Sequence, residues 1–249
     1  MSVSDLCSTS VSTTSSADIS SPGSESTSTT PKYTPALIII DMQNDFVYGT
    51  LAVPDAATII EPVNSLIDLP FKVKVATRDF HPDSHISFAE THRKPLFSTT
   101  MIYHPEDPHE IMGMQQVLWP IHCVAYTGGA DFVPGLKTTE FDAVVHKGTH
   151  PNIESYSAFR DIWHKAVSEL PDILASHGIT DVYFAGLAGD YCVKYTALDA
   201  VEFGYKSWVV TDAVKSISQD QLAFEEMKKK GVELITCEDL MARLNAFGD

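Results

Sequence analysis

The sequence has 249 residues, with 17 basic and 33 acidic side chains and a formal net charge of −16 at pH 7. This charge argues against broad binding to the phosphate backbone of nucleic acids and fits a small neutral substrate, although a local basic pocket stays compatible with it. No stretch approaches the roughly 18 consecutive apolar residues that span a membrane, so we expect no membrane partner. The cysteines form no CxxC pair and do not suggest a disulfide framework; they are Cys7, Cys123, Cys192 and Cys237.

The N-terminal segment differs in composition from the rest of the chain. Ser and Thr make up 18 of the first 31 residues, and such a segment cannot bury enough apolar surface to become ordered. We therefore predict a disordered Ser/Thr-rich tail over residues 1–33 and one domain over residues 34–249. The tail has neither the basic start and apolar run of a secretion signal nor the Arg content of a mitochondrial presequence. We expect a cytoplasmic protein, with the nucleus and the peroxisome as alternatives.

From residue 36 onward, short apolar runs alternate with amphipathic stretches. The first run, ALIII, is rich in β-branched residues, as is typical of a buried strand. The pattern predicts, in chain order, a strand at 36–40, a helix at 55–69, strands at 72–77 and 143–147, a helix at 159–174, a strand at 181–186, a helix at 190–203, a strand at 207–212, a helix at 218–230 and a strand at 232–236. Such alternation indicates βαβ units. We predict an α/β fold, a three-layer sandwich with a six-stranded, mostly parallel sheet.

The segment from residue 81 to residue 142 interrupts this alternation. It is rich in His, Pro and Gly and shows little periodicity, but its aromatic residues argue against disorder. Long irregular segments inside compact domains are usually functional. We therefore expect ordered, irregular structure that covers the edge of the sheet at which the chemistry takes place.

Polar residues follow four of the predicted strands. Asp41 follows the first strand, Asp79 and His81 follow the second, Lys147 ends the third, and Cys192 lies in the first turn after the fourth. In a parallel sheet these strand ends share one edge, where ligands bind. Taken singly, Asp41 has a plainer explanation as a helix cap, Lys147 as a solvated lysine and Cys192 as an inert buried thiol. Together they favour one functional cleft.

Cys192, Asp41 and Lys147 suit nucleophilic catalysis. A position at a helix N-terminus lowers the pKa of a thiol and favours the reactive thiolate. A carboxylate beside the thiol can take its proton, and a nearby ammonium favours the charged forms of both. The glycines of AGLAGDYCV (185–193) permit a tight turn, in which backbone N–H groups could hold an oxyanion.

Asp79 and His81 lie two residues apart, so they can point to the same side of an extended segment. His85 and His122 provide further imidazoles in the irregular segment. A carboxylate with imidazoles suits one divalent ion, for which we expect zinc, with iron and manganese as alternatives. A simple turn with a capping Asp is the other explanation of the HPDSH sequence.

Five segments then form an ordered series of motifs. They are IIIDMQNDF (38–46), ATRDFHPDSHISF (76–88), LWPIHCVAYTGGADF (118–132), HKGTHPNIESYSAF (146–159) and GLAGDYCVKYTALDA (186–200). On these motifs the sequence resembles the nicotinamidases, also called pyrazinamidases, a branch of the isochorismatase-like cysteine hydrolases. The resemblance covers nearly all of residues 36–236. The long segment before Trp119 is similar to that of the fungal members.

The resemblance implies a catalytic triad and a metal site. The triad residues would be Asp41, Lys147 and Cys192, and the metal ligands would be Asp79, His81 and His122. His85 occupies a position where some relatives have a ligand and others a group linked to the metal through water. The resemblance also implies a cis peptide between Leu187 and Ala188.

That cis peptide would aim the N–H groups of Ala188 and Cys192 into an oxyanion hole. Three aromatic residues match walls around a pyridine ring, with ordinary core packing as the alternative: Phe46, Trp119 and Tyr156. The sequence departs from many relatives at Gly189, where they have Thr, and we expect this to affect loop rigidity more than chemistry.

The implied activity is hydrolysis of nicotinamide to nicotinate and ammonia through a cysteine thioester, within NAD salvage. A homo-oligomer is left open. Two alternatives remain: an amidase for another heteroaryl amide or a carbamoyl compound, and a nicotinamide-binding sensor with an inactive site. A dinucleotide-binding protein is disfavoured because no GxGxxG follows a predicted strand.

Overall fold

The computed structural model of the protein describes residues 32–247, so the predicted tail lies almost entirely outside the described residues. The predicted strands form one six-stranded sheet, and every neighbouring pair in it is parallel. Its strands are β1 (Pro35–Ile40), β2 (Val73–Asp79), β5 (Ala143–Lys147), β6 (Asp181–Leu187), β7 (Lys206–Lys215) and β8 (Glu233–Ile235). Their order across the sheet is β5-β2-β1-β6-β7-β8, which puts β1 and β6 in the middle.

The central strand β1 explains why the sheet is covered on both faces. Its side chains alternate, with Leu37 and Ile39 packed into one core and Ala36, Ile38 and Ile40 packed into the other. All five are fully buried. A strand that is apolar on both sides can be stable only between two layers of helices.

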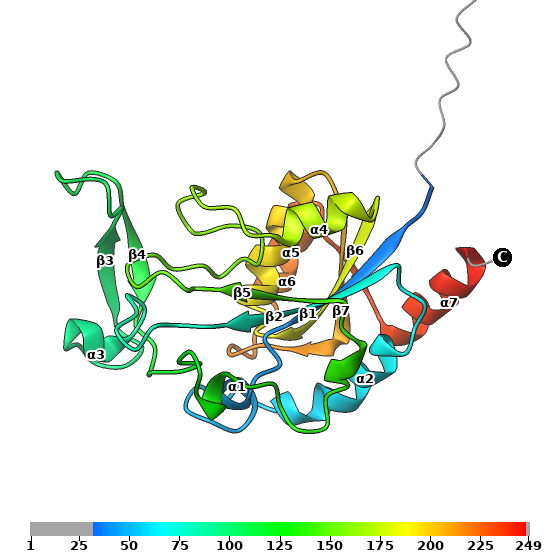
Figure 1. Ribbon diagram of the computed structural model, residues 1–249, viewed down its shortest axis with the longest axis horizontal. Coiled ribbons are helices and arrows are strands. Elements are labelled where there is room, and N and C mark those ends of the chain that lie inside the picture. Colours follow the sequence, from blue (N-terminus) through cyan, green and yellow to red (C-terminus); the bar gives the residue numbers. More distant parts are fainter. Residues whose placement is uncertain (1–31, 248–249) are drawn as a thin grey trace, which may run out of the picture. The chain divides into compact units, whose positions relative to one another are not determined.

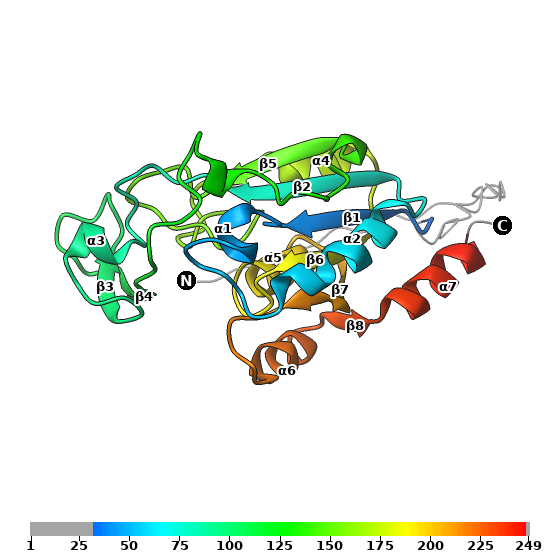
Figure 2. The ribbon, with the colours of Figure 1, turned by 90° about the horizontal axis from the view of Figure 1, so that it is seen from below.

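Helices form these two layers. The described α-helices are α1 (Asn44–Val47), α2 (Ile60–Ile67), α3 (Ala89–His92), α4 (Leu170–Ser176), α5 (Cys192–Glu202), α6 (Leu222–Lys229) and α7 (Cys237–Phe247). Helices α1, α2 and α7 contribute to the core on the Leu37 side, and α4, α5 and α6 to the opposite core. Figure 1 shows α4, α5 and α6 above the sheet and α1 and α2 below it, and Figure 2 shows the strands of the sheet side by side, from β5 at the top to β8 at the bottom. The predicted three-layer α/β sandwich is confirmed.

The predicted helix at 159–174 is wrong over most of its length, because helix α4 begins only at Leu170. The carboxylate of Asp161 accepts hydrogen bonds from the backbone N–H groups of Trp163, Lys165 and Ala166. An Asp side chain that binds nearby backbone groups in this way competes with helix formation. Pro171 then lies in the first turn of α4, where its missing N–H costs nothing.

The segment from residue 81 to residue 142 is ordered, as predicted, but it also contains elements that periodicity did not reveal. Strands β3 (Thr99–Tyr103) and β4 (Gly113–Val117) pair in an antiparallel hairpin, visible at the left of Figure 1. Short 3-10 turns are also present: η1 (Ala56–Ile59) before α2, and η2 (Gly128–Ala130) and η3 (Thr138–Glu140) in this segment. Helix α7 was not predicted either.

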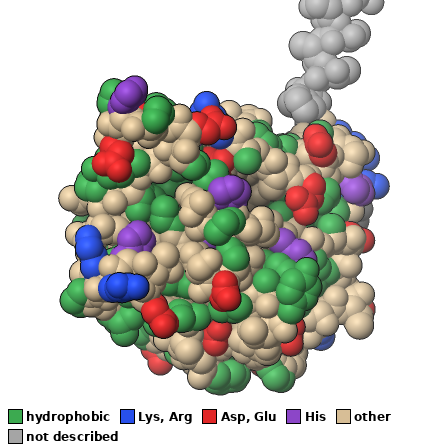
Figure 3. Space-filling view, turned by 60° about the vertical axis from the view of Figure 1, so that its left-hand side comes forward, with side chains coloured by type: hydrophobic (Ala, Val, Ile, Leu, Met, Phe, Trp, Pro, Cys, Tyr) green, Lys and Arg blue, Asp and Glu red, His purple; other side chains and the backbone are tan. Residues whose placement is uncertain are grey.

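The surface agrees with the acidic composition. On the face seen in Figure 3, Lys and Arg side chains occur in small separate groups among hydrophobic, acidic and His side chains, without a continuous basic patch. Within residues 32–247, every helix is too short or too polar to cross a bilayer.

Candidate active site

The strand ends bring the predicted polar residues together. Asp41 directly follows β1, Asp79 is the last residue of β2, and Lys147 is the last residue of β5. In the pairing of β2 with β5, Asp79 lies directly opposite Lys147. Cys192 is the first residue of α5, after β6 on the other side of β1. The parallel topology therefore collects these side chains at one edge of the sheet.

Lys147 is the centre of a buried ionic network. Its Nζ lies 2.8 Å from Asp41 Oδ2 and donates a hydrogen bond to Cys192 Sγ at 3.2 Å. It also forms an ion pair with Asp79. Burial opposes the charged form of Lys147, but the two carboxylates outweigh it and hold its pKa well above its usual value. The charged form of Lys147 is thus favoured, between the two carboxylates and the Cys192 thiol.

Asp41 is placed to act as a base. Thr77 donates a hydrogen bond from Oγ1 to Asp41 Oδ1 at 2.6 Å and accepts one from the Asp41 N–H at 3.1 Å. Asp41 Oδ2 faces Lys147, but among the described residues no donor is aligned on it as a hydrogen bond. Burial raises the pKa of Asp41, and the nearby Lys147 only partly offsets this. A buried carboxylate with a raised pKa and an available lone pair suits proton transfer.

Cys192 differs from the expectation based on helix position alone. Burial raises the pKa of the Cys192 thiol well above its usual value, although Lys147 acts in the opposite direction. The thiol is only 6% exposed, so loss of solvation outweighs the effect of the helix N-terminus. The thiol proton therefore needs an acceptor, and one oxygen of Asp41 lies within 4.8 Å of Cys192 Sγ.

The turn before Cys192 has the expected backbone. The peptide bond between Leu187 and Ala188 is cis. The Ala188 carbonyl accepts hydrogen bonds from the N–H groups of Tyr191 and Val193, which flank Cys192. The backbone around the thiol is thereby fixed at the start of α5.

Asp79, His81 and His122 form a second cluster beside the first. One ligand atom of each residue lies within 4.8 Å of the others, and all three side chains are buried. The Nε2 atoms of His81 and His122 lie 3.5 and 3.8 Å from Asp79 Oδ2. Their Nδ1 atoms lie 2.8 Å from the carbonyl oxygens of Gly148 and Pro120. Because a carbonyl only accepts, Nδ1 of each ring carries a hydrogen, and Nε2 is the nitrogen that faces the carboxylate.

This donor set fits a divalent metal ion. Two imidazoles with their second nitrogen anchored, together with one carboxylate, are the ligands that a catalytic metal site with open positions requires. Burial disfavours charge on His122 and, with the neighbouring His81, lowers the pKa of His122 to about 4, so its ring is neutral near pH 7. Burial also acts against charge on His81, but the Asp79 carboxylate outweighs it and raises the pKa of His81. The cluster therefore attracts positive charge.

His85 lies against this cluster, but both of its ring nitrogens already have hydrogen-bond partners. Its ring stacks on that of His81, with 4.0 Å between the ring centroids. Nδ1 lies 2.8 Å from Ser87 Oγ, and Nε2 lies 3.2 Å from the Ile153 carbonyl, to which it must donate. This arrangement favours a supporting position for His85 over that of a direct ligand.

The three predicted aromatic residues line one cavity together with Cys192 and the three candidate metal ligands. The cavity is bounded by Phe46, Leu51, Asp79, His81, Trp119, His122, Glu154, Tyr156, Ala188, Tyr191, Cys192 and Ile217. The Tyr156 hydroxyl accepts hydrogen bonds from Gln116 Nε2 at 2.7 Å and from Trp119 Nε1 at 3.1 Å. The nucleophile, the candidate metal ligands and an aromatic enclosure are thus combined in a single pocket.

Comparison with known proteins agrees with this geometry. Residues 35–239 match the isochorismatase domain. The chain belongs to the isochorismatase family. A nicotinamidase of Saccharomyces cerevisiae is 38% identical over 202 residues, which cover 78% of this chain and 94% of that protein. An Acinetobacter baumanii nicotinamidase structure has a TM-score of 0.76 and 40% identity, covering 85% of this chain and 100% of that chain. A Pyrococcus horikoshii pyrazinamidase in complex with zinc has a TM-score of 0.64 and 38% identity, covering 81% and 98%.

In this isochorismatase-family member, four residues that line the cavity of Cys192 were not predicted from the sequence: Leu51, Glu154, Tyr191 and Ile217. Glu154 and Tyr191 lie inside two of the quoted motifs, and that position was the signal that could have identified them. Glu154 is buried and groups with His81 and His85. Leu51 and Ile217 lie in segments that gave no such signal.

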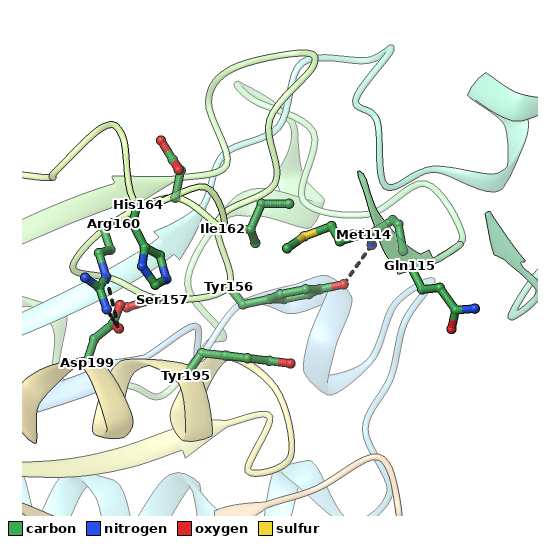
Figure 4. A pocket seen from close by; sticks show the side chains of 11 residues that line it. Met114, Gln115, Tyr156, Ser157, Arg160, Ile162, His164, Tyr195 and Asp199 are labelled. Atoms are coloured by element: carbon green, nitrogen blue, oxygen red, sulfur yellow. Dashed lines mark hydrogen bonds and ion pairs between the residues drawn. The ribbon is translucent and has the colours of Figure 1, made fainter. Parts of the chain in front are cut away.

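Tyr156 also lines a second cavity, whose side chains are drawn in Figure 4. It measures about 270 Å³, and its lining includes Met114, Ile162 and Tyr195. Tyr195 stacks on Tyr156, with 5.3 Å between the ring centroids and 19° between the ring planes. Tyr156 is therefore a wall shared by this side cavity and the cavity that contains Cys192.

Proposed function

We propose that this isochorismatase-family protein is a nicotinamidase, which hydrolyses nicotinamide to nicotinate and ammonia. The observation that carries the proposal is the contact of Lys147 with both Asp41 and Cys192, where Cys192 lines one cavity with Asp79, His81 and His122. The amide-hydrolysing relatives support it, because their similarity extends over most of this chain. Hydrolysis of nicotinamide to nicotinate is a step of NAD salvage.

In the first half of the reaction, Asp41 takes the proton of the Cys192 thiol. Cys192 Sγ then attacks the carboxamide carbon, and Lys147 stabilises the developing negative charge on sulfur. The N–H groups of Ala188 and Cys192 hold the oxygen of the tetrahedral intermediate. Asp41 returns its proton to the amide nitrogen, the C–N bond breaks, and ammonia leaves. The product on the protein is a nicotinoyl thioester at Cys192.

In the second half, Asp41 takes a proton from water, which attacks the thioester carbon. The same N–H groups hold the oxygen again. The C–S bond breaks, the proton on Asp41 returns to sulfur, and the nicotinic acid that leaves loses its own proton to solvent and becomes nicotinate. The raised pKa of Asp41 suits both halves, because the same carboxyl group accepts and returns a proton in each.

Asp79, His81 and His122 are proposed to hold the metal ion, and zinc is the proposed metal because a similar pyrazinamidase was solved with it. When bound, the ion would coordinate the pyridine nitrogen and orient the ring. Phe46, Trp119 and Tyr156 are proposed to enclose that ring. The cytoplasmic location stays a prediction, and the oligomeric state stays open.

Ammonia release from nicotinamide tests the proposal directly. The purified protein should release one ammonia for each nicotinate formed. Cys192→Ala should abolish turnover while it leaves the fold and nicotinamide binding intact. Activity on carbamoyl compounds without activity on nicotinamide would favour the related amidases, and binding without any turnover would favour a sensor.

A further inference from the structure

Residues 43–45, which follow Asp41, bind the backbone at or next to two of the candidate metal ligands, Asp79 and His122. Gln43 is fully buried. Its Nε2 donates to the carbonyl oxygens of Asp79 at 2.8 Å and Ala130 at 2.9 Å, and its Oε1 accepts from the Asp79 N–H at 2.8 Å. One amide side chain therefore binds both backbone groups of Asp79, directly behind the carboxylate that faces the two histidines.

Asp45, two residues further on, binds the segment of the other ligand. Its Oδ2 accepts a hydrogen bond of 2.7 Å from the N–H of Cys123, the residue after His122. Cys123 has a φ of 46°, a backbone conformation that a non-glycine residue rarely adopts without support. A β-carbon at Gly129 would collide with Asp45 Oδ2, so the neighbouring loop leaves room for this carboxylate.

We infer that Gln43 and Asp45 are positioning residues that set the distance between Asp79 and His122 before a metal ion binds. Asp79 and His122 come from different segments of the chain, which bind each other through the His81 N–H and the Cys123 carbonyl at 3.0 Å. Residues 43–45 bind both segments at further points, at the Asp79 backbone and at the Cys123 N–H. Side chains that orient metal ligands typically change metal affinity about 10- to 100-fold when they are removed. This inference rests on the proposed metal site, and neither residue is assigned a contact with substrate or metal.

Asn44 offers a matched control between the two. Its Nδ2 donates to the Gly128 carbonyl at 2.7 Å, in the same loop, and this contact is exposed. It therefore shares the position, the polarity and the partner loop of its neighbours but binds no segment of a metal ligand. A general loosening of residues 43–45 would affect all three variants, whereas loss of ligand positioning would spare Asn44→Ala.

The experiment measures binding of Zn²⁺ alone to metal-stripped full-length protein, by competition with a chromogenic chelator. Gln43→Ala and Asp45→Ala should each bind Zn²⁺ about 10- to 100-fold more weakly than the unaltered protein, and Asn44→Ala within about twofold. Asp45→Asn keeps an acceptor oxygen for the Cys123 N–H and should recover most of the affinity. Gln43→Glu, of the same size, keeps the acceptor for the Asp79 N–H but loses both donors, so it should stay weak.

Thermal unfolding of each metal-free variant shows whether it is folded, and Gln43→Glu carries the test if an Ala variant is not. Zn²⁺ affinities of Gln43→Ala, Gln43→Glu and Asp45→Ala equal to that of Asn44→Ala would overturn the inference. The measurement contains no nicotinamide. A protein that binds Zn²⁺ as described but releases no ammonia would contradict the proposed function alone.

Discussion

Replacing Lys147 by Met tests whether the buried ionic network is organised as the structure indicates. Met has a similar length without the charge, so the change leaves Asp41 and Asp79 without their shared ammonium. Both carboxylates are at most 4% exposed, and removing one partner of a buried ion pair costs about 3–5 kcal/mol. For a domain of this size, each kcal/mol lowers Tm by about 2–4 °C, so we expect a loss of roughly 6–20 °C.

The assay is thermal unfolding by circular dichroism at pH 7, with a chelator present so that Asp79 has no other strong cation. Lys137→Met is the matched control. Lys137 pairs with Asp68 at 2.6 Å, but the two side chains are 43% and 58% exposed, and exposed pairs contribute at most about 1 kcal/mol. Adding Asp41→Asn to Lys147→Met should restore part of the loss, because it removes one uncompensated charge. Equal shifts in Tm for the Lys147 and Lys137 variants would refute the reasoning.

Three further predictions concern catalysis. Removal of the metal by chelation and dialysis should weaken nicotinamide binding, measured by calorimetry, and adding back a divalent ion should restore it. If verified metal-free protein binds and turns over nicotinamide unchanged, the role proposed for the metal is contradicted. Benzamide lacks the ring nitrogen, so its kcat/KM should be roughly a hundredfold lower than that of nicotinamide, which corresponds to about 3 kcal/mol of activation free energy. Pyrazinamide keeps a nitrogen at the equivalent position and should remain a substrate. Equal kcat/KM values for benzamide and nicotinamide would mean that the ring nitrogen is not held. Thr77→Val removes a hydrogen bond that favours charged Asp41, so the pKa of Asp41 should rise further and the acidic limb of the kcat/KM profile should move to higher pH; an unshifted limb would exclude Asp41 as the titrating base.

The sequence predicted the sheet and the gathering of its polar strand ends because both follow from local patterns. A run such as ALIII must be buried on both sides, and parallel strands place Asp41, Asp79 and Lys147 at one edge. Neither statement needs any knowledge of contacts between distant residues.

Features that depend on distant contacts were not predictable in this way. The supporting position of His85 depends on the Ile153 carbonyl, which is remote in sequence. The raised pKa of Cys192 depends on how completely other segments bury the thiol. The prediction of a helix at 159–174 was wrong for a different, local reason. The side chain of Asp161 binds nearby backbone N–H groups in place of helical hydrogen bonds, and hydrophobic periodicity contains no information on such contacts.

The shared wall at Tyr156 has a consequence for inhibitors. Its hydroxyl is held by Gln116 and Trp119, and Tyr156 lines both the cavity of Cys192 and the side cavity. A nicotinamide analogue with a bulky substituent aimed at this wall must break two hydrogen bonds before it gains space. Exchanging Tyr156 for a small residue would remove a side chain that lines both cavities and leave more room beside Cys192, so a screen of variants at this position should yield hydrolases for larger aromatic amides.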